Sequence, residues 1–322
     1  MGRGLAAVAL LAALTIPATA QAKGGSLLPW PSDAYTERDR STDTGRRLDL
    51  PRSLMPANKD GVRIDPTDMN RADGFSPGSM IIVRIPGLDN EAALKRSRLP
   101  GLDDLAASLD KRSPVVVFNA RTGKRHPVWA ELDSNATSDA NRVLIIRPAK
   151  NFKEGQRYVV VLRHLKDKNG KPIKRRHSGW KPFKRGLRKA GLRGHGGIYR
   201  AWSFTVASER SLAGRMLHIR DDAFRALGDT NLRDLKVAGK APAFTIDTVT
   251  DLTPAEDDRI ARRVDGTMTV PCYLTDACAP GGHFTFSSKG LPEYHGTTTA
   301  KFTCRIPRSA LDPASPPRRA HV

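Results

Sequence analysis

The hydrophobic pattern of residues 201–224 changes its period at Ser208, and this change divides the chain into two parts. Trp202, Phe204 and Val206 alternate with smaller residues, which predicts a strand. Ser208 is a suitable N-cap for a following helix, and Gly228 can end that helix. Apolar residues recur between them every three or four positions, as on one helix face: Leu212, Met216, Ile219, Ala223 and Leu227. We therefore expect a β-rich module before the junction and a smaller module after it.

Short apolar segments separated by turn signals fill the part of the chain before this junction. Five strands are predicted there besides Trp202–Val206: Met80–Ile85, Pro114–Phe118, Val128–Leu132, Val143–Ile146 and Arg157–Leu162. Strands at this spacing favour an antiparallel sandwich, so we expect an immunoglobulin-like β-sandwich over residues 76–208. Residues 23–75 lack periodicity and predict an extended arm, with Trp30 and Phe75 as its anchors. The expected fold class is mainly β, and α+β overall.

The predicted sandwich contains a basic insertion at residues 164–200, just before its last strand. Trp180, Phe183, Leu187 and Ala190 recur at helical spacing, and Gly191 follows as a stop signal. This spacing indicates that the two aromatic rings belong to a buried face and do not stack on bases, so no specific nucleic acid is expected. The stretch from Arg163 to Arg193 holds thirteen Lys or Arg and one acidic residue.

Such a concentration of cations could bind a polyanion, such as an anionic cell-surface polymer or an anionic lipid. The candidate residues are Lys174, Arg175, Arg176, Lys184, Arg185, Arg188 and Lys189. The competing interpretation is a solvated basic face without a dedicated ligand, since charge runs commonly serve only solubility. The formal net charge of the whole chain, +21, fits either interpretation.

The second module, residues 209–311, is expected to contain a helix and a small α+β segment. Thr253-Pro-Ala-Glu256 has the pattern of a capping box and predicts a second, short helix that ends near Gly266. Alternating apolar residues then predict strands around Met268–Leu274 and Ala300–Ile306, with a shorter strand at Phe284–Phe286 between them. Residues 312–322 have no pattern and are expected to be an unstructured tail.

Residues 1–22 have the pattern of a secretory signal peptide. Arg3 supplies the positive charge, Leu5–Ile16 the apolar stretch, and residues 20–22 the small-residue cleavage site, so we expect cleavage near Ala22 and secretion. The three cysteines of an exported chain allow one disulfide. We favour Cys272–Cys278, which closes a short loop, over Cys272–Cys304 across two strands. Cys304 would then be a buried free thiol, or would pair with a cysteine in a further domain.

Candidate metal ligands do occur in the second module. Cys272, Cys278, His283 and His295 could be read as a zinc set, but the spacing between the cysteines is longer than usual and export favours a disulfide. The oxygen-rich segment Asp133–Asp139 lacks the order of a calcium loop and is interpreted as a hairpin loop. We therefore expect no metal and no cofactor.

Several runs resemble secreted lipase-like bacterial proteins of the α/β-hydrolase type. The runs are Trp30-Pro-Ser-Asp33, Val143-Leu-Ile-Ile-Arg-Pro148, Phe204-Thr-Val-Ala-Ser208, Met216-Leu-His-Ile-Arg-Asp-Asp-Ala-Phe224, Val270-Pro-Cys-Tyr-Leu274 and Cys304-Arg-Ile-Pro-Arg-Ser309. In that family an exported N-terminal region with a bacterial immunoglobulin-like domain precedes a serine hydrolase domain. The resemblance implies that the Ile-Pro-Arg-Ser segment leads into the first hydrolase strand and its Gly-rich oxyanion loop.

The chain departs from that family where catalysis would begin. It ends about a dozen residues after Ser309, as a truncated or frame-shifted terminus would, and we expect no Gly-x-Ser-x-Gly nucleophile elbow anywhere in it. No catalytic residue of the family can be transferred. We expect a non-catalytic accessory region of a secreted lipase-like hydrolase, whose partner is a separate hydrolase domain. The alternative is a free-standing secreted protein that binds a polyanion or the cell wall.

Overall fold

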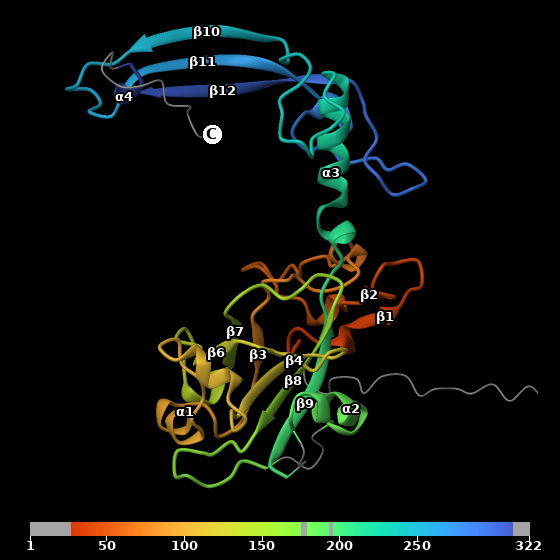
Figure 1. Ribbon diagram of the computed structural model, residues 1–322, viewed down its shortest axis with the longest axis vertical. Helices are drawn as coiled ribbons and strands as arrows, with labels where there is room; N and C mark the ends of the chain where they lie inside the picture. Colours follow the sequence, from red (N-terminus) through yellow and green to blue (C-terminus); the bar gives the residue numbers. More distant parts are fainter. Residues whose placement is uncertain (1–26, 175–178, 193–195, 312–322) are drawn as a thin grey trace, which may run out of the picture. The chain divides into compact units, whose positions relative to one another are not determined.

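The computed structural model describes residues 27–174, 179–192 and 196–311 (Figure 1). The predicted signal peptide and the predicted tail lie outside these residues. The chain is mainly β, as expected, and divides into two units after Leu212. No helix in the described part combines the length and the apolar character that crossing a membrane requires.

Two antiparallel sheets form the first unit. The three-stranded sheet has the order β3 (Ile81–Val83), β7 (Leu144–Pro148), β6 (Val128–Leu132). The four-stranded sheet has the order β5 (Arg125–His126), β4 (Val115–Asn119), β8 (Arg157–Arg163), β9 (Ile198–Thr205). Both sheets contribute to one hydrophobic core, in which Ile81 and Leu144 of one meet Val160 and Phe204 of the other. The six strands predicted here from apolar patterns are all present; β6 has the predicted ends and the other five have shifted ends.

The four-stranded sheet is buried on both faces. Residues 158–162 of β8 are all buried, although alternate side chains point to opposite sides of a strand. Its outer face packs against a second core, which the basic insertion covers with Leu187 and Ala190. The insertion contains η6 (Lys181–Phe183) and α2 (Lys184–Lys189). The predicted buried helical face is confirmed.

The arm preceding the sheets forms a hairpin of β1 (Thr36–Arg38) and β2 (Arg46–Leu48). Three short 3₁₀ helices accompany it: η1 (Asp33–Tyr35), η2 (Arg52–Leu54) and η3 (Met69–Arg71). Trp30 pairs with Ile82 and Phe75 with Val206 through isolated bridges, and the two aromatic rings lie edge to face at 4.9 Å. The arm is therefore attached to both sheets at its predicted anchors.

Short helices connect the strands of the first unit. Residues 105–109 form a 3₁₀ turn, η4 (Leu105–Leu109), and Leu102, Leu105 and Leu109 are exposed. A further turn, η5, covers Asp139–Asn141. Helix α1 (Glu91–Ser97) was not predicted, because two turns are too few for a periodic pattern. Its start is defined by Asn90, whose side chain accepts a hydrogen bond from the Ala93 N–H at 3.1 Å.

Helix α3 (Glu209–Ala226) begins directly after Ser208, as predicted. The Ser208 hydroxyl accepts a hydrogen bond from the Ser211 N–H at 3.2 Å, the geometry of an N-cap. The buried carboxylate of Asp73 accepts two hydrogen bonds from Ser208, one from its N–H at 2.9 Å and one from its hydroxyl at 2.7 Å. The arm thereby holds the strand-to-helix junction.

The second unit contains a three-stranded antiparallel sheet in chain order, which Figure 1 shows as three long strands side by side. Its strands are β10 (Phe244–Asp251), β11 (Ile260–Pro271) and β12 (Thr297–Pro307). A 3₁₀ turn, η7 (Asp276–Cys278), and a short helix, α4 (Arg308–Leu311), complete the unit. The strand predicted at Phe284–Phe286 is wrong, because these residues form only isolated bridges, and β10 is the third strand instead.

The helix predicted after Thr253 is also wrong. Its capping interaction exists, because Glu256 accepts hydrogen bonds from the Thr253 N–H and hydroxyl at 2.7 and 2.8 Å. The chain nevertheless turns and enters β11 at Ile260, and Gly266 lies within this strand. A central strand gains backbone pairing on both sides, and this tertiary pairing overrides a local helix-start signal.

Cys272 and Cys278 form the predicted disulfide, with Cα atoms 5.9 Å apart. The alternative Cys272–Cys304 bond is incompatible with the register, which places Val264 opposite Cys304. Cys304 is a free thiol, but it is exposed, whereas burial had been expected. The apolar alternation around Cys304 identified one face of the sheet correctly, but that face is not buried in the described part of the chain.

Asp73→Ala should lower the free energy of unfolding of the first unit by about 2–4 kcal/mol, because two buried donors of Ser208 lose a charged acceptor. Denaturant unfolding followed by Trp fluorescence measures this, since all four Trp residues precede Leu212. The matched control is Asp43→Ala, which removes only an exposed ion pair with Arg210 at the same helix start and should cost below about 0.5 kcal/mol. Equal effects of the two substitutions would contradict the proposed role of Asp73.

The native oxidised protein should react with one equivalent of a thiol reagent, at Cys304. Cys304→Ser should abolish this reaction without releasing a thiol elsewhere, because the other two cysteines are bonded to each other. Peptide mapping without reduction gives an independent check. A peptide linking Cys272 to Cys304 would show that the register is wrong.

Candidate functional site

Close packing holds the basic insertion against the four-stranded sheet. Gly186 of α2 faces the ring of Phe118, where an added Cβ would come within 3.0 Å of the ring. Gly123, in the turn after β4, approaches the backbone of Lys189 so closely that an added Cβ would lie 2.5–2.9 Å from its atoms. This close packing fixes the position of the turn relative to α2, and with it the positions of the side chains on both.

Two half-buried arginines hydrogen-bond to backbone carbonyls near this attachment. Arg125 donates from Nε to the Ala190 carbonyl at the end of α2, at 3.1 Å, and from Nη1 to the Asp110 carbonyl at 2.6 Å. Arg163 donates from Nε to the Ser113 carbonyl at 2.9 Å. Desolvation lowers the pKa of both guanidinium groups below the ordinary value. Both arginines therefore have a structural role, because their guanidinium groups donate to backbone carbonyls of the same unit.

A cavity of about 420 Å³ lies between α2, the turn after β4 and strand β8. Four cations line it: Arg121, Arg157, Arg185 and Lys189. Arg185 and Lys189 are four residues apart on α2 and therefore lie on the same side of the helix. Val159, Pro182 and Phe183 supply an apolar wall. The volume is in the range of small-molecule sites, and the lining combines positive charge with an apolar surface.

Asp33 compensates part of this positive charge. Its Oδ2 accepts hydrogen bonds from Arg157 Nε at 2.8 Å and from the Ser203 hydroxyl at 2.6 Å, and its Oδ1 accepts one from the Thr205 hydroxyl at 2.9 Å. Lys189 donates to the backbone carbonyl of Arg121 at 2.7 Å. The guanidinium groups of Arg121 and Arg185 make no ion pair within the described residues, so the cavity keeps an excess of positive charge.

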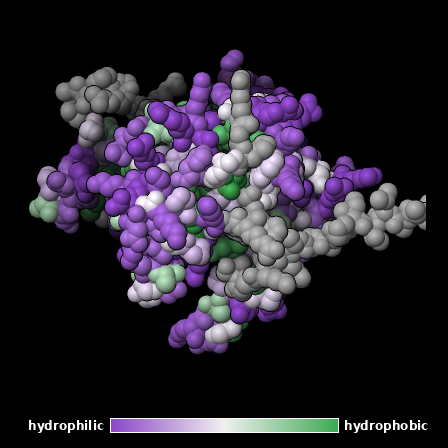
Figure 2. Space-filling view, turned by 90° about the horizontal axis from the view of Figure 1, so that it is seen from below, coloured by the Kyte–Doolittle hydropathy of each residue, from purple (hydrophilic) through white to green (hydrophobic). Residues whose placement is uncertain are grey.

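Only two of the seven predicted polyanion-binding residues line this cavity, Arg185 and Lys189. Lys184, Arg188 and Lys174 are exposed but do not line it, and Arg175 and Arg176 lie outside the described residues. Sequence reasoning missed Arg121 and Arg157. The turn pattern Ala120-Arg-Thr-Gly123 could have pointed to Arg121, but nothing local to Arg157 indicates that it reaches the same place. The face of the chain seen in Figure 2 is predominantly hydrophilic, with small apolar areas between the polar residues.

The Gly-x-Ser-x-Gly pattern, which was expected to be absent, occurs once, at residues 74–78. It lies in a loop before β3 and no helix follows it. An added Cβ on Gly74 would lie 2.6–2.7 Å from backbone atoms of residues 205–207, so this glycine permits close packing. The exposed Ser76 hydroxyl accepts a hydrogen bond from the Gly78 N–H and none from a histidine in the described part. The pattern is structural.

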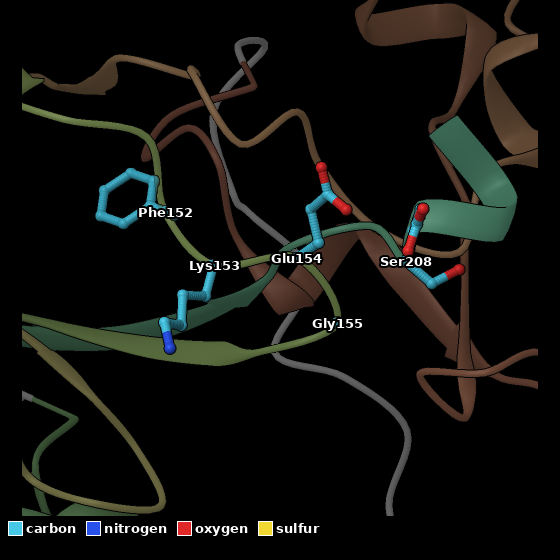
Figure 3. A pocket seen from close by; sticks show the side chains of 6 residues that line it. Phe152, Lys153, Glu154, Gly155 and Ser208 are labelled. Atoms are coloured by element: carbon cyan, nitrogen blue, oxygen red, sulfur yellow. The ribbon is translucent and has the colours of Figure 1, made fainter. Parts of the chain in front are cut away.

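A second, open hollow of about 520 Å³ is lined by residues 152–155 and by Ser208 and Glu209 (Figure 3). Figure 3 shows the Phe152 ring directed away from Ser208, and this ring is buried in the core. The Ser208 hydroxyl is already committed to Asp73 and to the helix start. The hollow therefore offers carboxylates and one lysine but no activated nucleophile.

The sheet of the second unit presents an apolar face. Cross-strand partners share a face, and most rows of paired residues from β10, β11 and β12 separate apolar from polar side chains. The ion pair of Asp251 with Arg262 lies in the row at one end of the apolar face. The apolar face carries Phe244, Ile246, Val249, Val264, Met268 and Phe302. Phe244, Ile246 and Val249 are 62%, 52% and 54% exposed. Within the described residues, Gly266 is the only residue of this sheet that is buried.

The opposite face of this sheet is polar. It carries the threonines of β10 together with Asp265, which accepts a hydrogen bond from the Thr303 hydroxyl at 2.6 Å and pairs with Arg263 at 3.0 Å. The two faces therefore differ as the inner and outer faces of a half-buried sheet do. The exposed Cys304 lies on the apolar face, in the same row as Val249 and Val264.

The candidate zinc ligands form no group that could hold a metal ion within the described residues, and three of the four have other roles. Cys272 and Cys278 are joined in the disulfide, and His295 contacts the Thr285 hydroxyl through Nε2. His218 and Tyr273 attach this region to α3, through the Pro292 carbonyl at 3.1 Å and the Asp222 carboxylate at 2.8 Å respectively. Burial, together with the hydrogen bond to Asp222, raises the pKa of Tyr273.

Comparison with protein-family models, with curated proteins and with solved structures found no match. Two surfaces remain as candidate functional sites, the cationic cavity of the first unit and the apolar sheet face of the second.

We expect no esterase activity from the chain, and no labelling of Ser76 by a serine-directed covalent probe. Ser76→Ala should change stability by less than about 0.5 kcal/mol, because the side chain is exposed. Gly74→Ala should destabilise the first unit by about 1–3 kcal/mol through overpacking. Acyl-ester hydrolysis above the buffer rate that Ser76→Ala abolishes would show that the pattern is catalytic.

Proposed function

We propose that this chain is a non-catalytic accessory region of a secreted lipase-like hydrolase, and that the apolar face of β10–β12 receives the hydrolase domain. The observation that carries the proposal is the amphipathic sheet, whose apolar side no described residue buries. A three-stranded sheet gains independent stability from packing its hydrophobic face, and large exposed apolar patches mark interaction sites. The Cys272–Cys278 disulfide supports an extracellular setting.

The first unit fits the immunoglobulin-like domain that this proposal includes. Its two strand orders, β3-β7-β6 and β5-β4-β8-β9, correspond to the B-E-D and C′-C-F-G orders of an immunoglobulin-like sandwich. The bridge of Trp30 to Ile82 stands where a first strand would pair with the second. Tyr158, near the start of β8, accepts a hydrogen bond from the Lys153 N–H at 3.0 Å, which corresponds to a tyrosine corner.

The size of the apolar face favours a partner that belongs to the same polypeptide. Taken over the eight residues of β10, three strands with a rise of about 3.3 Å and a spacing of about 4.8 Å give a face of roughly 400 Å². Free partners that associate stably bury about 800 Å² each, so a second copy on this face alone falls short. Interfaces between domains of one chain begin at about 600 Å² in total, which this face satisfies.

The connectivity of the sheet supports the choice of partner. Strand β12 contains part of the Cys304-Arg-Ile-Pro-Arg-Ser309 run, and in the proteins that the chain resembles this run leads into the hydrolase domain. A domain joined there begins a few residues from the apolar face. Tethering of this kind raises the effective concentration to the millimolar range, so a small interface suffices.

Alkylation of Cys304 tests the docking, because this exposed thiol lies on the apolar face. We expect a small maleimide to react at least about tenfold more slowly in a fusion of this chain to the hydrolase domain of a family member than in the chain alone. Ile246→Lys and Val249→Lys should restore fast alkylation in the fusion. Thr245→Lys and Thr250→Lys, on the polar face, are the matched controls and should leave the protection intact.

Three outcomes would contradict the proposal. One is equal alkylation rates in the fusion and in the chain alone. Another is loss of protection by the controls on the polar face. The third is a dimer of the chain alone, seen by light scattering and abolished by Ile246→Lys, since the face would then receive a second copy.

A further inference from the structure

We propose that the cationic cavity between α2 and strand β8 is a binding site for a phosphate ester, independent of the proposed role of the second unit. The shared chemistry of the ligand is a phosphate group attached to a small carbon skeleton. A phosphodiester cell-surface polymer and a phospholipid headgroup are two sources of that chemistry. A diffuse basic surface would bind through many cations, whereas this site binds through the few cations that line one cavity.

The charge at the cavity selects an anion. Arg121, Arg157, Arg185 and Lys189 line it, and Asp33 is the carboxylate that hydrogen-bonds to one of them, Arg157. The guanidinium groups of Arg121 and Arg185 stand on different elements, the turn after β4 and helix α2. Planar guanidinium groups present pairs of N–H donors that match phosphate oxygens, which favours phosphate over a carboxylate of lower charge.

The rest of the lining limits the size and the nature of the ligand. Val159 is 1% exposed and closes the base of the cavity, while Pro182 and Phe183 form an apolar side. Inorganic phosphate would leave this apolar side uncovered, whereas a glycerol or sugar skeleton would contact it. The volume of about 420 Å³ accommodates a group of that size.

The site is preformed by packing and does not depend on folding around a ligand. Gly123 and Gly186 allow α2 to approach the sheet, and Leu187 anchors the helix in the second core. Arg157 is oriented by Asp33 and by the Ser203 hydroxyl, which lies 2.7 Å from Arg157 Nη2. A ligand would therefore order only the exposed ends of Arg121, Arg185 and Lys189, which lowers the entropic cost of binding.

Helix α2 supplies a matched control. Lys184 and Arg188 are also four residues apart, carry the same charges and are equally exposed, but they do not line the cavity. Calorimetric titration with glycerol 3-phosphate should therefore show binding that Arg185→Ala with Lys189→Ala weakens by about tenfold or more, since each lost contact is charge-assisted. Lys184→Ala with Arg188→Ala should change the dissociation constant by about twofold or less.

Parallel titrations with inorganic phosphate and with phosphatidylglycerol vesicles distinguish the sources. Weaker binding of inorganic phosphate than of glycerol 3-phosphate supports a role for the apolar side. Vesicle binding that depends on Arg185 and Lys189 but not on Lys184 and Arg188 assigns the site to a lipid headgroup, whereas glycerol 3-phosphate binding without vesicle binding assigns it to a soluble or polymeric ester. Equal losses in both double variants, or no binding of any of the three probes, would overturn the proposal. Thermal unfolding of each variant confirms that it is folded, and all four substituted side chains are exposed.

Discussion

The need to cover both faces of the four-stranded sheet determines the architecture of the first unit. Residues 158–162 of strand β8 are all buried, so neither side of the strand faces solvent there. One face packs against the three-stranded sheet, and the other requires the insertion with Leu187 and Ala190. The insertion is consequently both a structural cover and the carrier of the densest positive charge. Two of its charged side chains, Arg185 and Lys189, line the cationic cavity together with Arg157 at the start of β8.

In the second unit, no described residue buries the apolar face of the sheet. The sheet β10–β12 has one largely apolar face, with the Asp251–Arg262 ion pair at its end, and within the described residues this face remains accessible. Burial of apolar area contributes about 25 cal/mol per Å², so roughly 400 Å² of uncovered face represents about 10 kcal/mol of gross hydrophobic free energy. Ordering and association costs reduce what a partner would gain. A gross term of this size still explains why such a face favours a covering domain.

The parts of the fold that repeat a pattern over several residues could be predicted from the sequence, and the parts that depend on distant contacts could not. Six strands, the buried face of the insertion and the junction at Ser208 follow from local periodicity and capping. The helix expected after Thr253 failed because pairing of β11 with two neighbours outweighs a genuine capping interaction. Within the cavity, Arg185 and Lys189 were identified through charge density, whereas Arg121 and Arg157 join them only through tertiary packing. The pattern at Gly74–Gly78 shows that a short motif can also mislead. It lacks the strand–turn–helix context of a nucleophile elbow, and close packing explains its first glycine.

The arm contributes to the cationic cavity through Asp33, which pairs with Arg157. The Trp30-Pro-Ser-Asp33 run is held on β9 by a hydrogen bond from the Trp202 indole to the Pro31 carbonyl at 3.0 Å and by the bonds of Asp33 to Ser203 and Thr205. Asp33 thereby places one negative charge beside four cations. Without it, Arg157 would face Arg121, Arg185 and Lys189 with no compensating carboxylate, and mutual repulsion would oppose the approach of α2 to the sheet. With it, four cations stand against one carboxylate, and the remaining positive charge would attract a dianionic ester. The position of the arm is thus as important for the cavity as the insertion itself.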